Sequence, residues 1–143
     1  RNAVCDLPME RALLNHLGWS GNLCAPYPYV IHADSELCNR IAGDDMIHGI
    51  TVACGGFYGP QGRQLRIPLA DPHQNEKIES FEYQGRKITN YEMESSALAG
   101  LSKLLGHRAT TVCLVIADRL NKQSNTNYKE NINQLIQLVL ERI

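Results

Sequence analysis

An apolar, β-branched run from Met46 to Cys54, closed by Gly55 and Gly56, most constrains the fold of this 143-residue chain. Such a run, bounded by glycine, is typical of a strand buried in a parallel sheet. A second run, Thr110 to Ala117, has the same character. Because segments with helical periodicity separate the strand-like ones, the sequence predicts an α/β domain with a mostly parallel or mixed sheet.

Capping residues and apolar stripes predict five helices around these strands. The expected helices run from Asp6 to Gly18, from Asp34 or Ser35 to about Ala42, from Asp71-Pro72 past Ile78 and Phe81, from about Glu94 to Leu105 with Gly106 as the C-cap, and from about Tyr128 to Arg142. Residues 83–88 predict a turn that leads into a short strand, and the polar, Asn-rich residues 118–127 predict a loop.

Composition and charge exclude several classes of function. The formal net charge is −1, and no cluster of Lys and Arg is longer than a pair, which argues against a nucleic-acid partner. No apolar run approaches the length of a membrane span, and the first residues lack the apolar core of a signal peptide. We therefore expect a globular domain that binds neither nucleic acid nor membrane.

The cysteines and histidines point to a reduced, metal-free protein. Five cysteines, an odd number without Cys-x-x-Cys spacing, indicate reduced and mostly buried thiols in a cytoplasmic protein. The five histidines are scattered and form no recognisable ligand pair, so we expect no metal site.

The Gly/Pro-rich segment after the first strand carries an amide and a guanidinium two residues apart, Gln61 and Arg63. An amide can both donate to and accept from the edge of a uracil ring, and an arginine can donate to a second carbonyl. Phe57 and Tyr58, just before them, supply aromatic faces that can stack on a base. Considered by itself, the segment Gly59-Pro60-Gln61-Gly62-Arg63 is also compatible with an ordinary surface turn and a solvated arginine.

The segment Glu92-Met93-Glu94-Ser95 lies where a strand gives way to a helix. A carboxylate accepts hydrogen bonds from two vicinal hydroxyls, as on ribose. The alternative is that both acids complement the positive end of the following helix. The two interpretations are compatible, because a first-turn carboxylate can also face a pocket.

The end of the second apolar run, Ile116 and Ala117 followed by Asp118 and Arg119, is a third candidate. Pockets in open α/β sheets form at the carboxyl ends of strands. Asp118 alternatively forms an ion pair with Arg119 or caps the turn.

The loop Phe57-Tyr58-Gly59-Pro60-Gln61-Gly62-Arg63 and the segment Glu92-Met93-Glu94-Ser95 together resemble the uridine phosphorylases of the nucleoside phosphorylase superfamily. The resemblance extends from about Tyr29 to Leu140. It implies a three-layer sandwich with a mixed central β-sheet flanked by helices. It also implies roles for single residues: Arg63 and Glu94 as catalytic residues; Phe57, Gln61, Arg63, Ile116 and Ala117 around the base; Met93 and Glu94 on the ribose; and Tyr91, Glu92, Asp118 and Arg119 as further candidates.

The reaction implied by the resemblance is the reversible phosphorolysis of uridine to uracil and ribose 1-phosphate, in nucleoside catabolism and pyrimidine salvage. It needs inorganic phosphate as co-substrate and no organic cofactor. The family's phosphate-binding residues have no counterpart here, so residues 1–143 are expected to be a single domain that forms the C-terminal portion of a longer one. Asp118 stands where the pyrimidine enzymes have Asn, which keeps a purine nucleoside phosphorylase or a nucleosidase as an alternative. A nonenzymatic nucleoside-binding domain is the alternative from a different class.

The resemblance also implies a homo-oligomer built from dimers, up to a hexamer. Trp19, Tyr27 and Tyr29 lie in a Gly/Pro-rich segment and are candidate interface anchors. The alternative is that these aromatic side chains cover the domain's own core.

Overall fold

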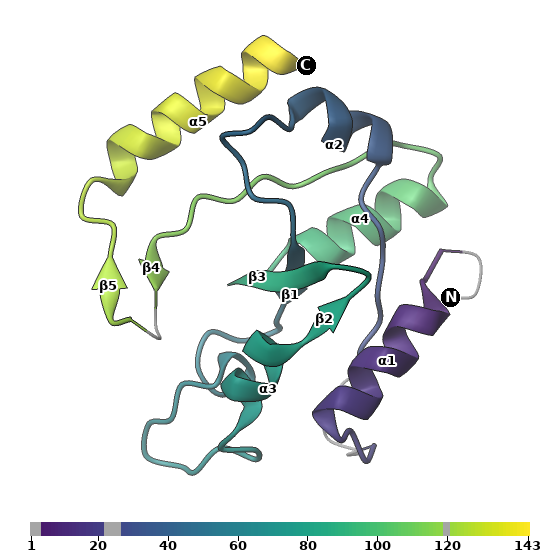
Figure 1. Cartoon of the computed structure of the whole chain (residues 1–143), viewed down its shortest axis with the longest axis vertical. Helices are drawn as coiled ribbons and strands as arrows, with labels where there is room; N and C mark the ends of the chain where they lie inside the picture. The colour runs from purple at the N-terminus through teal and green to yellow at the C-terminus, as the bar shows by residue number, and fades with distance from the viewer. Residues whose placement is uncertain (1–3, 22–26, 119–120) are drawn as a thin grey trace.

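The structure is a computed structural model that describes residues 4–21, 27–118 and 121–143 (Figure 1). Helices and strands alternate along most of this part of the chain. In chain order the elements are α1 (Leu7–Leu17), α2 (Ser35–Ile41), β1 (Ile50–Ala53), the 3-10 turn η1 (Gly59–Gln61), α3 (Gln74–Ser80), β2 (Glu82–Tyr83), β3 (Arg86–Glu92), α4 (Ser95–Leu104), β4 (Ala117–Asp118), β5 (Gln123–Ser124) and α5 (Tyr128–Arg142).

A mixed three-stranded sheet in the order β1-β3-β2 forms the centre of the domain. β1 and β3 run parallel, whereas β2 and β3 form a tight hairpin through Gln84 and Gly85, both at positive φ. Helix α4 packs against β1, and α3 packs against β3 and α1 (Figure 1). The predicted class, a three-layer α/β sandwich with a mixed sheet, is therefore confirmed.

The pairing of β1 with β3 contains a β-bulge. Ile50 lies opposite Ile88, but the next residue, Thr51, lies opposite Asn90, so Thr89 is an extra residue on β3. Thr89 packs against Gly49, where a Cβ would collide with its side chain. The bulge shifts every later residue of β3 by one position relative to β1.

The predicted helix caps are confirmed where side chains set them locally. Asp6 accepts a hydrogen bond from Met9 N at 2.9 Å, and Asp34 accepts one from Leu37 N at 2.9 Å. Gly18 ends α1 in the left-handed conformation, at φ 65°. Helix α3 begins later than predicted, because the carboxylate of Asp71 accepts from His73 N and forms a separate turn before the helix.

The predicted strand Thr110–Ala117 is wrong over most of its length. Residues 110–116 belong to no described strand, and only Ala117–Asp118 form β4, which pairs with β5. In Figure 1 this segment runs from α4 towards β4 without joining the central sheet. An apolar run becomes a strand only where a neighbour satisfies its backbone groups, and no described strand lies in register with it. The first strand is also shorter than predicted, since Met46 N closes a turn onto Gly43 O.

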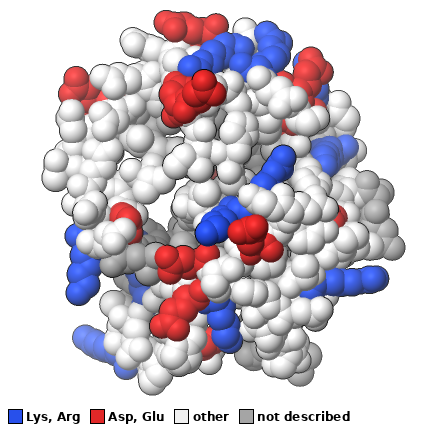
Figure 2. Space-filling model, in the orientation of Figure 1, with Lys and Arg blue, Asp and Glu red and all other residues white. Residues whose placement is uncertain are grey.

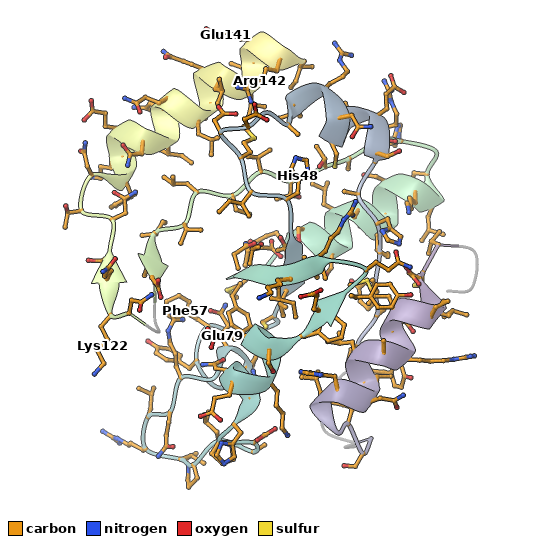
Figure 3. The ribbon with its side chains drawn as sticks, viewed as in Figure 1. His48, Phe57, Glu79, Lys122, Glu141 and Arg142 are labelled. Carbon is orange, nitrogen blue, oxygen red and sulfur yellow. The ribbon has the colours of Figure 1, made fainter. Side chains whose placement is uncertain are left out.

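The buried apolar core lies around α1, α2 and α3. Its buried apolar residues are Met9, Ile41, Ile78 and Phe81. The expected apolar face of α4 is exposed instead, with Leu98 and Leu101 more than half accessible, and Gly100 faces inwards against Ile31. Helix α5 has no buried residue, and Arg142 fastens its end to Ile41 O and to the Asp45 carboxylate (Figure 3).

The four cysteines that the structure describes are free thiols, and none is fully buried. Cys113 is exposed, which corrects the expectation of mostly buried cysteines, and Cys24 lies outside the described residues. Within the described ranges, no three or more metal-binding side chains converge on one point. The described helices are also too short or too polar to cross a bilayer.

Candidate nucleoside site

Two loops leave the same edge of the sheet because β1 and β3 are parallel. Ala53, the last residue of β1, pairs with Glu92, the last residue of β3, and Cys54 N donates to Glu92 O at 2.9 Å. The glycine loop that follows β1 (residues 55–63) and the carboxylate segment that follows β3 (residues 92–95) therefore begin as neighbours. Carboxyl ends of parallel strands are where α/β proteins place their ligands.

The glycine loop folds so that Gln61 and Arg63 lie side by side. Pro60 fits the first turn of η1, and Gly62 follows at φ 69°, a conformation that favours glycine. Arg63 N turns back onto Tyr58 O at 2.9 Å, and Arg63 Nη1 donates to Gln61 Oε1 at 3.2 Å. Gln61 is 3% exposed, so its amide is buried.

Arg63 also stacks on Phe57. Its guanidinium carbon lies 3.6 Å from the centre of the ring, and Nη1 donates to Phe57 O as well. Phe57, labelled in Figure 3, is 51% exposed and meets Tyr58 edge-on. One face of Phe57 is thus covered by a cation, and a base stacked on Phe57 would use the other face or displace Arg63. Within the described residues no carboxylate pairs with Arg63, so its charge is available to an anion.

The two glutamates at the end of β3, Glu92 and Glu94, have different roles. The Glu92 carboxylate accepts from Glu94 N at 2.8 Å, from Ser95 N at 2.6 Å and from Ser95 Oγ at 2.6 Å, and so caps the start of α4. Partial burial raises the pKa of Glu92, but these hydrogen bonds outweigh it and hold the pKa below its ordinary value. Glu94 is exposed, and its carboxylate meets no donor in the described part of the chain. Glu92 therefore stabilises the helix, and Glu94 remains open to a ligand.

Met93 and Tyr91 flank the glutamates. Met93 is 42% exposed, so its thioether can pack against a sugar. The Tyr91 hydroxyl instead donates to Asn75 Oδ1 at 2.9 Å, which ties β3 to the first turn of α3. The site residues that sequence reasoning missed are in this turn: Gln74 Nε2 donates to Pro60 O at 2.7 Å, and Asn75 Nδ2 donates to Gly62 O at 3.5 Å. An amide pair at a helix start, one turn after Asp71-Pro72, was the available signal.

The third candidate segment, Ile116 to Asp118, forms no recorded hydrogen bond with the glycine loop or the carboxylate segment among the described residues. Ala117 pairs with Ser124 in the β4–β5 hairpin, and Ile116, which is 52% exposed, accepts from Asn125 N. Asp118 accepts from Asn121 N at 3.1 Å and from Asn121 Nδ2 at 2.7 Å, so it caps this turn. Arg119 lies outside the described residues.

A wide hollow of about 2350 Å³ lies between β1 and residues 110–115, and an opening in this face is visible in Figure 2. Arg63, Asn90 and Ser95 line part of it, whereas Gln61 and Glu94 do not. Its volume exceeds the roughly 300–1,000 Å³ of a pocket for one small molecule. The figure shows acidic and basic residues interspersed over this face. The hollow is therefore a gap between elements, and the glycine loop and the start of α4 reach its lining through Arg63 and Ser95.

Comparison with known proteins identifies the superfamily of the chain. Residues 15–143 match the phosphorylase superfamily. The chain belongs to this superfamily. A search of curated proteins finds no match for this phosphorylase-superfamily chain.

A solved relative of the superfamily chain is a nucleoside phosphorylase from Trypanosoma brucei, whose crystal structure is described as showing uridine phosphorylase activity. The two are 27% identical and superpose with a TM-score of 0.60. The match covers 92% of this chain and 38% of the trypanosomal one. This phosphorylase-superfamily chain thus spans well under half the length of that relative.

Proposed function

We propose that this chain supplies the base- and ribose-binding part of an enzyme that cleaves uridine reversibly with inorganic phosphate, giving uracil and ribose 1-phosphate. The observation that carries the proposal is that Arg63, a cation without a carboxylate partner among the described residues, and Glu94, an exposed carboxylate, lie on two loops that begin side by side at one sheet edge. Membership of the phosphorylase superfamily and likeness to a nucleoside phosphorylase support it.

The chemistry assigns each side chain a task. When phosphate attacks the anomeric carbon, the glycosidic bond breaks and the base leaves with negative charge, which Arg63 stabilises. Gln61, which is buried and accepts from Arg63 Nη1, holds the guanidinium in position beside the base. Glu94 accepts from the ribose hydroxyls and stabilises the positive charge that develops on the sugar. The transfer needs no organic cofactor, and the phosphate contacts lie outside the residues assigned here.

A binding experiment tests the base site. The chain is titrated with uridine and with inosine, and the amide shifts of residues 55–63 are followed by NMR. We expect uridine to bind more tightly, and Arg63→Ala to weaken it about tenfold or more, as for a lost hydrogen bond to a charged group. Arg66→Ala is the matched control, because Arg66 is an exposed arginine just beyond the same loop.

Three results would contradict parts of the proposal. Tighter binding of inosine would favour a purine substrate. The turn-capping role of Asp118 argues against that outcome, because both of its oxygens accept from Asn121. Equal effects of the Arg63 and Arg66 variants would remove Arg63 from the site. Binding of neither nucleoside would refute the proposal for this chain.

Self-association is part of the same proposal. Tyr27 and Tyr29 are 53% and 43% exposed, as interface anchors would be in a free protomer, whereas Trp19 is half-buried. We propose that the tyrosines contribute to a homodimer, the unit of a larger assembly. Sedimentation of the chain should depend on its concentration, and Tyr27→Ala should shift it towards the monomer. A monomer at every concentration would contradict this part.

A further inference from the structure

We propose that Tyr91, Asn75 and Gln74 form a hydrogen-bonded brace that fixes the spacing between the base-binding loop and the ribose-binding carboxylate. The three are positioning residues, and they act through Gln61, Arg63 and Glu94. The inference rests on the proposed function, since it assigns the two loops to base and ribose.

The brace begins on β3, immediately before the carboxylate segment. Tyr91 is half-buried, and its hydroxyl donates to Asn75 Oδ1 at 2.9 Å. Tyr91 is three residues from Glu94 along the chain, and Glu92, between them, caps α4. A shift of Tyr91 would therefore also move the ribose-binding segment.

The brace ends on the glycine loop. Asn75 is half-buried and donates its amide to Gly62 O at 3.5 Å, while Gln74 Nε2 donates to Pro60 O at 2.7 Å. Pro60 and Gly62 are the immediate neighbours of Gln61 in the chain, and Gly62 also precedes Arg63. Two carbonyls on either side of Gln61, which itself accepts from Arg63, are thus held from a single helical turn.

The fit between loop and brace is close. A Cβ built at Gly62 would collide with the side chain of Asn75. The Cys54 thiol also donates to Pro60 O, at 3.3 Å, so the end of β1 holds the same carbonyl. The loop is thus fastened to β1, to α3 and through Asn75 to β3, the strand that carries the glutamates.

The brace has a consequence for ligands that a general structural role lacks. Uridine must engage both loops at once, whereas uracil engages only the base loop and ribose only the carboxylate. If the spacing of the two loops is fixed, little further conformational entropy is lost when uridine makes its second contact. Loss of the brace should therefore weaken uridine and spare its two halves.

The test compares Tyr91→Phe with the unmodified chain. Affinities for uridine, uracil and ribose are measured by NMR titration, at a temperature where both proteins are folded. We expect uridine to weaken about tenfold, the equivalent of one lost hydrogen bond, and uracil and ribose to change less than about twofold. Tyr83→Phe is the matched control, because Tyr83 is a half-buried tyrosine of the same sheet whose hydroxyl bonds to no described residue.

A second variant and a second readout keep the two proposals distinguishable. Asn75→Asp retains the acceptor for Tyr91 but loses the donor to Gly62 O, and should give the same selective loss. Trypsin should also cut faster after Arg63 in both variants, with unchanged cleavage after the exposed Arg86.

Each outcome decides one of the two proposals. Equal weakening of uridine, uracil and ribose, or no weakening, would overturn the brace. If the unmodified chain binds none of the three, the proposed function fails, and unchanged cleavage after Arg63 then refutes the brace independently.

Discussion

Exchanging each glutamate after β3 for glutamine should give opposite phenotypes. Glu92 accepts three hydrogen bonds at the start of α4, and Gln retains only one carbonyl oxygen. Loss of a helix cap of this kind costs about 1–2 kcal/mol in the free energy of unfolding. With an unfolding entropy of about 0.3 kcal/mol/K for a chain of this size, Glu92→Gln should lower the melting temperature by about 3–7 °C.

Glu94→Gln should leave stability almost unchanged and weaken the ligand instead. Its carboxylate is exposed and unpaired in the described part of the chain, so the free energy of unfolding should change by less than about 0.5 kcal/mol. Affinity for uridine should fall about 10- to 100-fold, as for a lost charged hydrogen bond. The fall for 2′-deoxyuridine should be smaller, because that nucleoside has already lost one hydroxyl partner.

The assays are thermal denaturation followed by circular dichroism and nucleoside titration of both variants. The reasoning is refuted if Glu94→Gln lowers the melting temperature as much as Glu92→Gln does. It is also refuted if folded Glu92→Gln, rather than Glu94→Gln, loses more affinity for uridine than for 2′-deoxyuridine. Equal losses of Glu94→Gln on uridine and 2′-deoxyuridine would remove Glu94 from the ribose.

The pKa of Glu92 is lowered in the folded state, so the ionised carboxylate stabilises the fold above its ordinary pKa of 4.5, and this stabilisation is lost as pH falls through the folded value. Urea denaturation at about pH 6 and about pH 3 measures the free energy of unfolding at each pH. The decrease from the higher to the lower pH should be smaller for Glu92→Gln than for the unmodified chain. Gly62→Ala should cost about 1 kcal/mol or more, because φ is 69° and the new Cβ meets Asn75, whereas Gly59→Ala, where the Cβ meets open space, should cost less; the difference is read from denaturation midpoints, and equal costs would contradict it. The 143 residues alone should release no uracil from uridine with phosphate, because their sequence contains no recognisable phosphate-binding motif; phosphate-dependent uracil release, seen by chromatography, would contradict this.

Local rules were enough to predict both ends of α1 and the start of α2. Asp6, Asp34 and Gly18 act through hydrogen bonds or backbone conformation within one turn, so their roles are written in a few neighbouring residues. The bounds of α5 follow from its periodicity in the same way. The meeting of two loops at one sheet edge was also predictable, because it requires only that the strands before them be parallel.

Features that depend on distant partners were not predictable. The run Thr110–Ala117 has the composition of a strand, but no described strand provides its ladder. The division of roles between Glu92 and Glu94 depends on which carboxylate turns back onto α4, and their spacing does not reveal this. The contacts of Gln74 with the glycine loop join residues fourteen positions apart, which no local pattern specifies.

The bulge at Thr89 sets the phase of everything that follows it on β3. Side chains alternate between the two faces of a strand, so an unbulged pairing would place Tyr91, in the position now held by Glu92, opposite Ala53. The tyrosine and the glutamates would then exchange faces relative to the glycine loop. Deleting Thr89 would leave the residues of both loops unchanged, but the carboxylates would no longer lie on the same face relative to the glycine loop. The number of residues between Ile88 and Tyr91 therefore matters to the site as much as the identity of any side chain in it.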